Sequence, residues 1–374
     1  MIGDRHRSVS TWACQALSAL AIAALVVGCG GSSTNVPGYK QTRLVANNAG
    51  VAPVTDPHLL NAWGIAHSPM GPWWVSNNHS GTSTVYDGNG NPFPTPVPLV
   101  VTVPPPPGSP PGAMGAPTGM VFNGSTDFQI DDGTTSAPAI FIWAGEDGII
   151  SAWRQNLATD PLTAVVEAND PNAIYKGLAI SSAGGVSRLY ATNFHEGTVH
   201  VFDGNFQRLD NSGFEDPNIP AGFAPFGIQN INGNIFVTYA KQDDNKEDDT
   251  AGPGNGFVDI YDNTGNLQSR FVSQGHLNSP WGVVLAPASF GRLGGLIFIG
   301  NFGNGLINAY DPGTGAFKGA LNLRNGSALQ ISKLWALAFG NDGSAGSSNT
   351  LYFSAGPNDE NDGLFGMIEA SPSS

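Results

Sequence analysis

The sequence predicts an all-β protein, a six-bladed β-propeller of four-stranded antiparallel blades closed by an N-terminal strand. Three observations predict it: a glycine-centred segment that recurs six times, the short strand-like segments that follow each copy, and a composition rich in turn-forming residues. The 374 residues include 50 Gly and 28 Pro beside 40% apolar residues, which is typical of many short strands joined by tight turns.

The repeat is centred on a small residue at the start of a short apolar strand. Successive centres are 55, 58, 50, 55 and 54 residues apart, and this steady spacing indicates one structural unit per repeat. Glycine suits the position because the innermost strands of a propeller crowd around its axis, where a missing side chain lets backbones approach. The six centres are Gly64, Gly119, Gly177, Gly227, Gly282 and Ala336.

Each copy continues with strands that alternate apolar and polar residues, and most copies close with an Asp- or Asn-Gly turn and a fourth strand, such as 267–272 or 316–321. The last copy ends after its third strand, near Ile368, whereas a lone strand, 42–46, precedes the first copy. We therefore expect this strand to complete the last blade and close the ring, which removes an exposed edge.

The N-terminus has the pattern of a secretory signal, because Arg5 and Arg7 precede an apolar run that reaches Gly28. The segment Val26-Val27-Gly28-Cys29 resembles a bacterial lipobox, in which the cysteine becomes the lipidated first residue, although Val26 stands where leucine is more usual. An ordinary signal peptide and a membrane anchor are the alternatives, and the run is short for a spanning helix.

These features predict four segments along the chain: a signal peptide over 1–28, a lipidated Cys29 with a flexible tether over 29–39, the propeller over 40–370, and a tail over 371–374. The protein would then be exported, face the periplasm or the cell surface, and touch the membrane only through the lipid at Cys29. Because Cys14 would leave with the signal, the mature chain would hold neither a disulfide nor a cysteine metal site.

The net charge limits the classes of ligand that the sequence allows. A formal net charge of −14 repels nucleic acid and anionic lipid, so no nucleic-acid partner is expected, whereas cations and neutral ligands are compatible with it. Acidity of this kind also serves solubility alone.

Polar residues gather in the loops that join the second and third strands of the predicted blades. In a propeller these loops share one face with the loops that lead into the next blade, and they ring the mouth of the central channel. Their carboxylates, amides and imidazoles suit a hard cation such as Ca²⁺, or sugar hydroxyls, although tight loops have this composition without any ligand. The candidates are Asn77, His79, Glu146, Asp147, Asn193, His195, Glu196, Asp243, Asp244, Asn301, Asn358 and Asp359.

The longest of these loops, 241–256, carries five carboxylates between Asp243 and Asp249. It is compatible with a Ca²⁺ ligand, with a cover over the channel mouth, or with a mobile, solvated insertion. Trp63 and Trp281 are expected near the mouth, where they either pack between blades or stack on a sugar ring. No hydrolase elbow, zinc-protease motif, phosphate loop or dinucleotide fingerprint is present in the sequence.

The Trp-Gly-Ile/Val strand starts, the segment 239–244 (Tyr-Ala-Lys-Gln-Asp-Asp) and the segment 279–283 (Ser-Pro-Trp-Gly-Val), together with the lipobox, resemble an uncharacterised family of exported bacterial six-bladed propeller lipoproteins. The resemblance covers about residues 40–370 and implies the fold without an activity. More distantly, the repeats resemble NHL and gluconolactonase-type propellers. Lactonases of that type hold one divalent cation with Glu, Asn and Asp, and these ligands do not align residue by residue with this chain.

Three functions follow as hypotheses. The first is a binding module for a protein or glycan ligand. The alternative is a metal-dependent hydrolase or lactonase that uses the channel mouth, with Ca²⁺ as the cofactor. A lyase or quinone-dependent dehydrogenase is less favoured, because the chain has only 15 Lys and Arg residues to hold anionic substrates or cofactors.

Overall fold

The computed structural model describes residues 38–210 and 213–371. The chain divides into two compact units, 1–34 and 35–374, and all described residues belong to the second. The predicted signal peptide and Cys29 lie outside the described residues. Among the described residues, no helix has the length and apolar character needed to cross a membrane.

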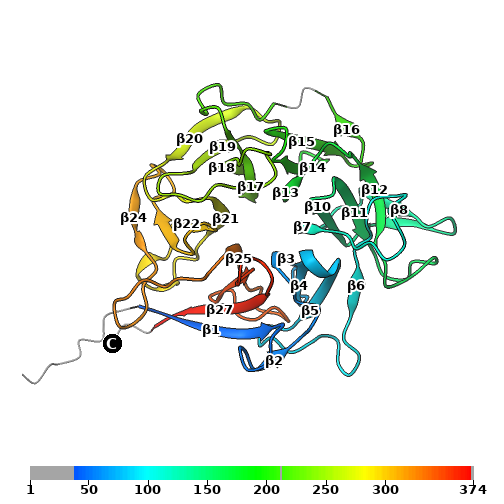
Figure 1. Ribbon diagram of the computed structural model, residues 1–374, viewed down its shortest axis with the longest axis horizontal. Helices are drawn as coiled ribbons and strands as arrows, with labels where there is room; N and C mark the ends of the chain where they lie inside the picture. Colours follow the sequence, from blue (N-terminus) through cyan, green and yellow to red (C-terminus); the bar gives the residue numbers. More distant parts are fainter. Residues whose placement is uncertain (1–37, 211–212, 372–374) are drawn as a thin grey trace, which may run out of the picture. The chain divides into compact units, whose positions relative to one another are not determined.

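The described residues form six antiparallel sheets arranged around an axis, which confirms the predicted propeller (Figure 1). Blade 1 consists of β3 (Ala62–His67), β4 (Trp73–Asn77), β5 (Thr82–Tyr86) and β6 (Val100–Thr102). Blade 2 consists of β7 (Pro117–Phe122), β10 (Phe141–Gly145), β11 (Ile149–Trp153) and β12 (Val165–Asn169). Blade 3 consists of β13 (Tyr175–Ala183), β14 (Val186–Asn193), β15 (Thr198–Asp203) and β16 (Arg208–Leu209).

Blade 4 consists of β17 (Phe223–Ile231), β18 (Asn234–Lys241), β19 (Phe257–Tyr261) and β20 (Leu267–Ser273). Blade 5 consists of β21 (Pro280–Leu285), β22 (Ile297–Asn301), β23 (Ile307–Tyr310) and β24 (Phe317–Ala320). Blade 6 consists of β25 (Leu334–Phe339), β26 (Leu351–Ala355), β27 (Leu364–Ala370), β1 (Tyr39–Ala46) and the short β2 (Val54–Thr55). The remaining elements are a hairpin within blade 2, β8 (Gln129–Asp131) and β9 (Ser136–Pro138), and two 3-10 turns, η1 (Asn78–Ser80) and η2 (Gly291–Leu293).

Blade 6 is built from both ends of the propeller, as the sequence predicts. β1 pairs antiparallel with β27 along its length, from Tyr39 opposite Ala370 to Ala46 opposite Leu364 (Figure 1). Leu44 and Val45 are buried, and β2 adds a parallel strand outside β1. The N-terminal strand therefore closes the ring.

The repeated glycine lies where each innermost strand approaches the next. A Cβ atom built on Gly119 would lie 2.3 Å from the backbone nitrogen of Leu178, and one on Gly227 would lie 2.1 Å from the carbonyl oxygen of Trp281. Gly64 and Gly282 meet the following blade in the same way, at 2.5 and 2.7 Å. No side chain fits at these positions without moving a backbone, which confirms the predicted reason for glycine.

Hydroxyl groups connect the blades beside these glycines. The Thr192 hydroxyl accepts a hydrogen bond from the Gly177 nitrogen of its own blade (2.8 Å) and donates one to the Phe226 carbonyl of the next (2.8 Å). Ser354 accepts from the nitrogen of Ala336 in blade 6 and donates to the Trp63 carbonyl in blade 1. The ring is thus closed by hydrogen bonds at its centre as well as by β1 at its rim.

Closure by β1 predicts a large loss of stability when the strand is weakened. We expect deletion of 40–47 to lower the free energy of unfolding of the whole propeller, and Leu44→Ala alone to lower it by about 2–5 kcal/mol, because Leu44 is a buried leucine. Urea unfolding followed by tryptophan fluorescence measures both. Lys40→Ala, which changes an exposed residue of the same strand, should change the free energy of unfolding by less than about 0.5 kcal/mol. An unchanged midpoint in the Leu44 variant would contradict closure by this strand.

Candidate functional site

The channel mouth on the loop-rich face is filled by aromatic side chains. Trp63 and Trp335 stack with ring centroids 3.6 Å apart, and Phe302 stacks on Trp335 at 4.0 Å. Phe194 and Phe226 complete the cluster, and Trp281 packs against it. We call these six side chains the aromatic plug. Trp63 is only 1% exposed, so of the two roles that the sequence allows for it the structure shows packing, which leaves neither face open to a sugar ring.

A buried lysine lies beside the aromatic plug. The Lys176 ammonium forms ion pairs with Glu146 and with Asp248, the latter at 3.0 Å, and lies 5.5 Å from the centre of the Trp63 ring. Burial alone would lower the pKa of Lys176, but the two carboxylates raise it above its usual value. The ammonium therefore stays charged and supplies the positive charge at the mouth.

A second group of charges lies next to Lys176, with Glu360 on the loop between β26 and β27 and Lys333 directly before β25. The Asn61 amide accepts a hydrogen bond from the Trp335 indole (2.9 Å) and donates one to Glu360 (3.0 Å), and the Lys333 ammonium lies 3.9 Å from Glu360. Burial raises the pKa of Glu360 to about 7, and the nearby Glu146 adds to the rise. Asn358, Asp359 and Glu360 all have positive φ, a conformation that costs free energy in residues other than glycine.

Two further carboxyls at the mouth hold their protons more tightly than usual. Burial raises the pKa of Asp147 to about 6, against the effect of the Ala116 amide that it accepts from. Burial also raises the pKa of Asp249. Carboxyls with raised pKa values close to a buried lysine are a common feature of functional sites.

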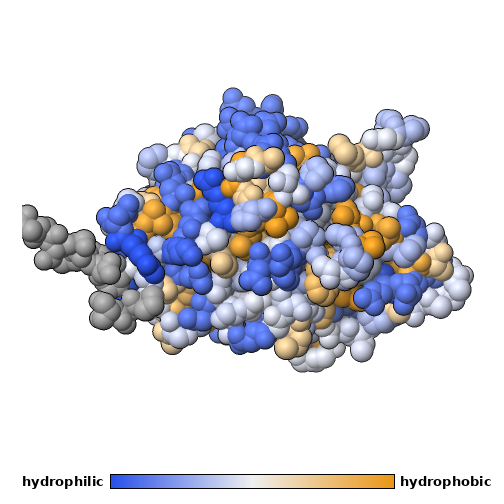
Figure 2. Space-filling view, turned by 90° about the horizontal axis from the view of Figure 1, so that it is seen from below, coloured by the Kyte–Doolittle hydropathy of each residue, from blue (hydrophilic) through white to orange (hydrophobic). Residues whose placement is uncertain are grey.

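The long loop 241–256 covers the mouth, one of the three roles that the sequence allows. Asp248 binds Lys176 of blade 3, the Gln242 amide donates to the Phe194 carbonyl (2.6 Å), and Asn278 accepts from the Gly252 nitrogen (2.8 Å). The loop is therefore attached to blades 3 and 5, while Asp244 and Glu247 remain exposed. Figure 2 shows a strongly hydrophilic projection on one face of the molecule.

Three predicted mouth residues, Asn77, Asn193 and Asn301, end the second strands of their blades and are fully buried. The Asn77 amide donates to two threonines of the adjacent strand (3.1 and 3.0 Å), and Asn301 accepts from the Asn278 nitrogen (2.9 Å). Asn193 accepts from the Ile174 nitrogen (3.2 Å). Their hydrogen bonds hold neighbouring loops.

The other predicted residues are divided between the mouth and solvent. Glu146 and Asp147 lie at the mouth, and Asp359 lies 4.0 Å from the Lys333 ammonium. Asp243 accepts from the Glu247 nitrogen within its own loop (2.9 Å), and His195 is half-buried. His79, Asp244 and Asn358 are exposed.

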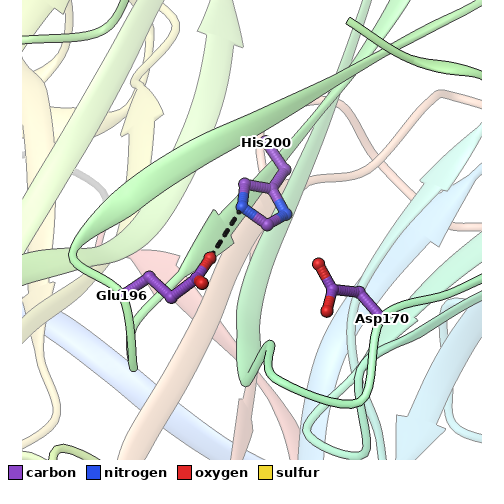
Figure 3. Close-up of side chains that lie close together, drawn as sticks. All are labelled: Asp170, Glu196 and His200. Atoms are coloured by element: carbon purple, nitrogen blue, oxygen red, sulfur yellow. Dashed lines mark hydrogen bonds and ion pairs between the residues drawn. The ribbon is translucent and has the colours of Figure 1, made fainter. Parts of the chain in front are cut away.

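Glu196 belongs to a separate cluster between blades 2 and 3 (Figure 3). The Glu196 carboxylate lies 3.1 Å from His200 Nε2, and the Tyr175 hydroxyl lies 2.9 Å from His200 Nδ1. Asp170 is bonded to Arg208 (2.7 Å), and its carboxylate lies close to the other two groups. Burial, with a contribution from Arg208, lowers the pKa of His200. A cavity of about 820 Å³ is lined by Glu196, His200 and Arg208.

Sequence reasoning missed Lys176 and His200, although both break a repeated pattern. Lys176 precedes its central glycine, where three other copies carry tryptophan, and a charge among buried aromatics indicates a paired ion. His200 occupies a third-strand position that is polar and buried in other blades, as at Thr84, Ser151 and Asn308. Alignment of the repeats by position, rather than by loop composition, would have found both.

The chain resembles two proteins of Acanthamoeba polyphaga mimivirus over most of its length. It is 30% identical over 339 residues to Uncharacterized protein R648, which covers 88% of this chain and 80% of that protein. It is 31% identical over 344 residues to Uncharacterized protein L690, with 88% and 85% covered. The chain belongs to the family of these mimivirus proteins. No protein-family model matches it.

Two solved structures that are similar to this chain are propellers with little sequence identity to it. The soluble aldose sugar dehydrogenase of Escherichia coli has a TM-score of 0.54 at 10% identity and covers 89% of this chain and all of that one. Virginiamycin B lyase of Staphylococcus aureus has a TM-score of 0.49 at 13% identity, with 88% and 99% covered. At 10% identity, the likeness to the aldose sugar dehydrogenase shows the fold alone.

The raised pKa of Glu360 predicts a pH-dependent stability. The unfolded chain loses this proton near the ordinary value of 4.5, whereas the folded protein holds it up to about 7. Stability should therefore fall as pH rises between these values, because only the folded state still binds the proton. We expect Glu360→Gln to reduce the fall in unfolding free energy between about pH 5 and 7, measured by urea unfolding at each pH.

The matched control is Glu369→Gln, which removes a half-exposed carboxylate from β27 and should leave the pH dependence as in the wild type. Equal slopes for the wild type and Glu360→Gln would contradict the assignment.

Proposed function

We propose that the protein is an exported, lipid-anchored propeller that works as a binding module, docking a basic segment of a protein partner on its loop-rich face. One observation carries the proposal: the aromatic plug and the loop 241–256 close the channel mouth, while Asp244 and Glu247 stay exposed on that loop. A closed, acidic surface suits a cationic partner that lies across it, because complementary charge speeds and orients association.

The alternatives have less support at the mouth. The Lys176 ammonium, between Glu146 and Asp248, already supplies the cation that a lactonase-type mouth would need from a metal. For a sugar ring, Trp63 and Trp335 offer no free face, since they are buried against each other, and Trp281 is half-buried against the aromatic plug. The observation that favours a metal-dependent hydrolase is the separate cluster of Asp170, Glu196 and His200.

Fluorescent peptides of equal length test the docking proposal. We expect the full chain to bind a lysine-rich peptide more tightly than a Gly/Ser peptide or a glutamate-rich one, measured by anisotropy, and to lose affinity between about 0.05 and 0.5 M salt. The double variant Asp244→Asn/Glu247→Gln should bind the lysine-rich peptide about threefold more weakly or worse, because it removes two exposed charges.

The control removes the same number of charges from the opposite face, with Asp127→Asn/Glu369→Gln, and should retain wild-type affinity. Equal loss in both double variants would show that net charge alone attracts the peptide and would contradict a docking face. Tighter binding of the Gly/Ser peptide would contradict the charge argument.

The proposed lipidation and membrane association are tested separately at Cys29. We expect the full chain, expressed in a bacterium, to incorporate labelled palmitate and fractionate with membranes, and Cys29→Ser to lose both properties, because the thiol is the proposed acceptor. Cys14→Ser lies within the proposed signal and should keep the label. Label retained in Cys29→Ser would contradict lipidation at this residue.

A further inference from the structure

Three side chains of types that bind metal ions lie close together between blades 2 and 3 (Figure 3). Asp170 follows β12, Glu196 lies in the turn between β14 and β15, and His200 lies on β15. One ligating atom of each lies within 4.8 Å of the other two. Ligands of a single ion with bonds of about 2.0–2.2 Å lie at most about 4.4 Å apart, so the half-buried Asp170 and the exposed Glu196 side chains would close on the ion as it binds.

The imidazole is already oriented for such an ion. His200 is 4% exposed, and its Nδ1 lies 2.9 Å from the Tyr175 hydroxyl, while Nε2 faces the Glu196 carboxylate at 3.1 Å. When Nδ1–H donates to the tyrosine oxygen, Nε2 carries the lone pair. The Asn193 amide lies 3.3 Å from Nε2, and a bound metal would replace this contact. Metal-binding histidines usually have their second nitrogen anchored in this way, which fixes the tautomer and the ring orientation.

The carboxylates are held as well. Arg208 bonds the Asp170 carboxylate at 2.7 Å, and the Asn193 amide donates to Glu196 at 2.6 Å. Arg208 orients Asp170 but also places a positive charge nearby, which lowers the affinity for a cation.

We propose that Asp170, Glu196 and His200 bind one divalent transition-metal ion of the Zn²⁺ class. One imidazole nitrogen with two carboxylates suits a borderline ion, whereas Ca²⁺ takes six to eight oxygen ligands. Glu196 and His200 also line the cavity of about 820 Å³. Three protein ligands, two of them on the wall of a cavity, leave coordination positions for water or a small ligand, as in open rather than structural zinc sites.

The experiment uses the full chain, freed of metal by a chelator and dialysed. We expect calorimetric titration with Zn²⁺ to give one site, and Co²⁺ to give a visible absorption band at the same stoichiometry. His200→Gln should abolish this site, and Glu196→Gln and Asp170→Asn should weaken it at least about tenfold. Tyr175→Phe, which changes a positioning residue, should weaken it by about tenfold or more while one site remains.

The control is His276→Gln, which removes an exposed imidazole stacked on Phe317 between blades 4 and 5 and should leave the site unchanged. Glu196 is half-exposed, so its variant is expected to fold and decides the question if His200→Gln does not. No stoichiometric Zn²⁺ binding to the wild type, or wild-type binding by Glu196→Gln, overturns the proposal. Displacement of Co²⁺ by an equal concentration of Ca²⁺ overturns the assigned metal class.

Discussion

In four of the six blades the innermost strand lies so close to the next that a methyl group at its central glycine would collide with the neighbouring backbone, at 2.1 Å in the case of Gly227. This approach brings together the residues that precede the six repeat centres, among them Trp63, Lys176 and Trp335, because six strands share one axis. The aromatic plug follows from that convergence: large apolar rings fill a narrow space that small residues would leave open. The backbone packing at the glycines therefore determines that the channel is closed at this face.

The buried charge of Lys176 then determines how the loops are arranged. An unpaired ammonium beside the aromatic plug would cost several kcal/mol, of the order known for broken buried ion pairs, ~3–5 kcal/mol. Its partners come from other blades, Glu146 from blade 2 and Asp248 from blade 4. The long loop of blade 4 is consequently attached across the centre of the propeller, and its other carboxylates are presented on the surface. The ion pair between Lys176 and Asp248 thus holds the acidic loop 241–256 against the buried aromatic plug.

The sequence was sufficient to predict the blades because five of the six repeats carry a glycine, and the sixth an alanine, at the crowded innermost strand. The missing fourth strand after Ile368 and the lone strand at 42–46 likewise predicted the closure that β1 and β27 form. The site was predicted less well, because loop composition does not tell a ligand from a loop anchor. Asn77 and Asn301 are buried anchors, whereas Lys176 and His200 were missed because they lie on strands and find their partners in other loops.

Lys176 and His200, the two residues that sequence reasoning missed, both lie in blade 3. Where the backbone repeats, chemical differences between blades are confined to side chains at equivalent positions. Blade 3 departs from the commonest pattern twice: Lys176 stands where three other copies place tryptophan, and His200 stands where blades 1, 2 and 5 place threonine, serine or asparagine. Blade 4 has a buried Asp259 at the position of His200. Both departures bury an ionisable group, which costs free energy, where an aromatic or a small polar residue fits the fold. Both groups are paired with carboxylates. Packing alone does not require either residue, and both the proposed metal site and the ion pair that holds the long loop of blade 4 depend on blade 3.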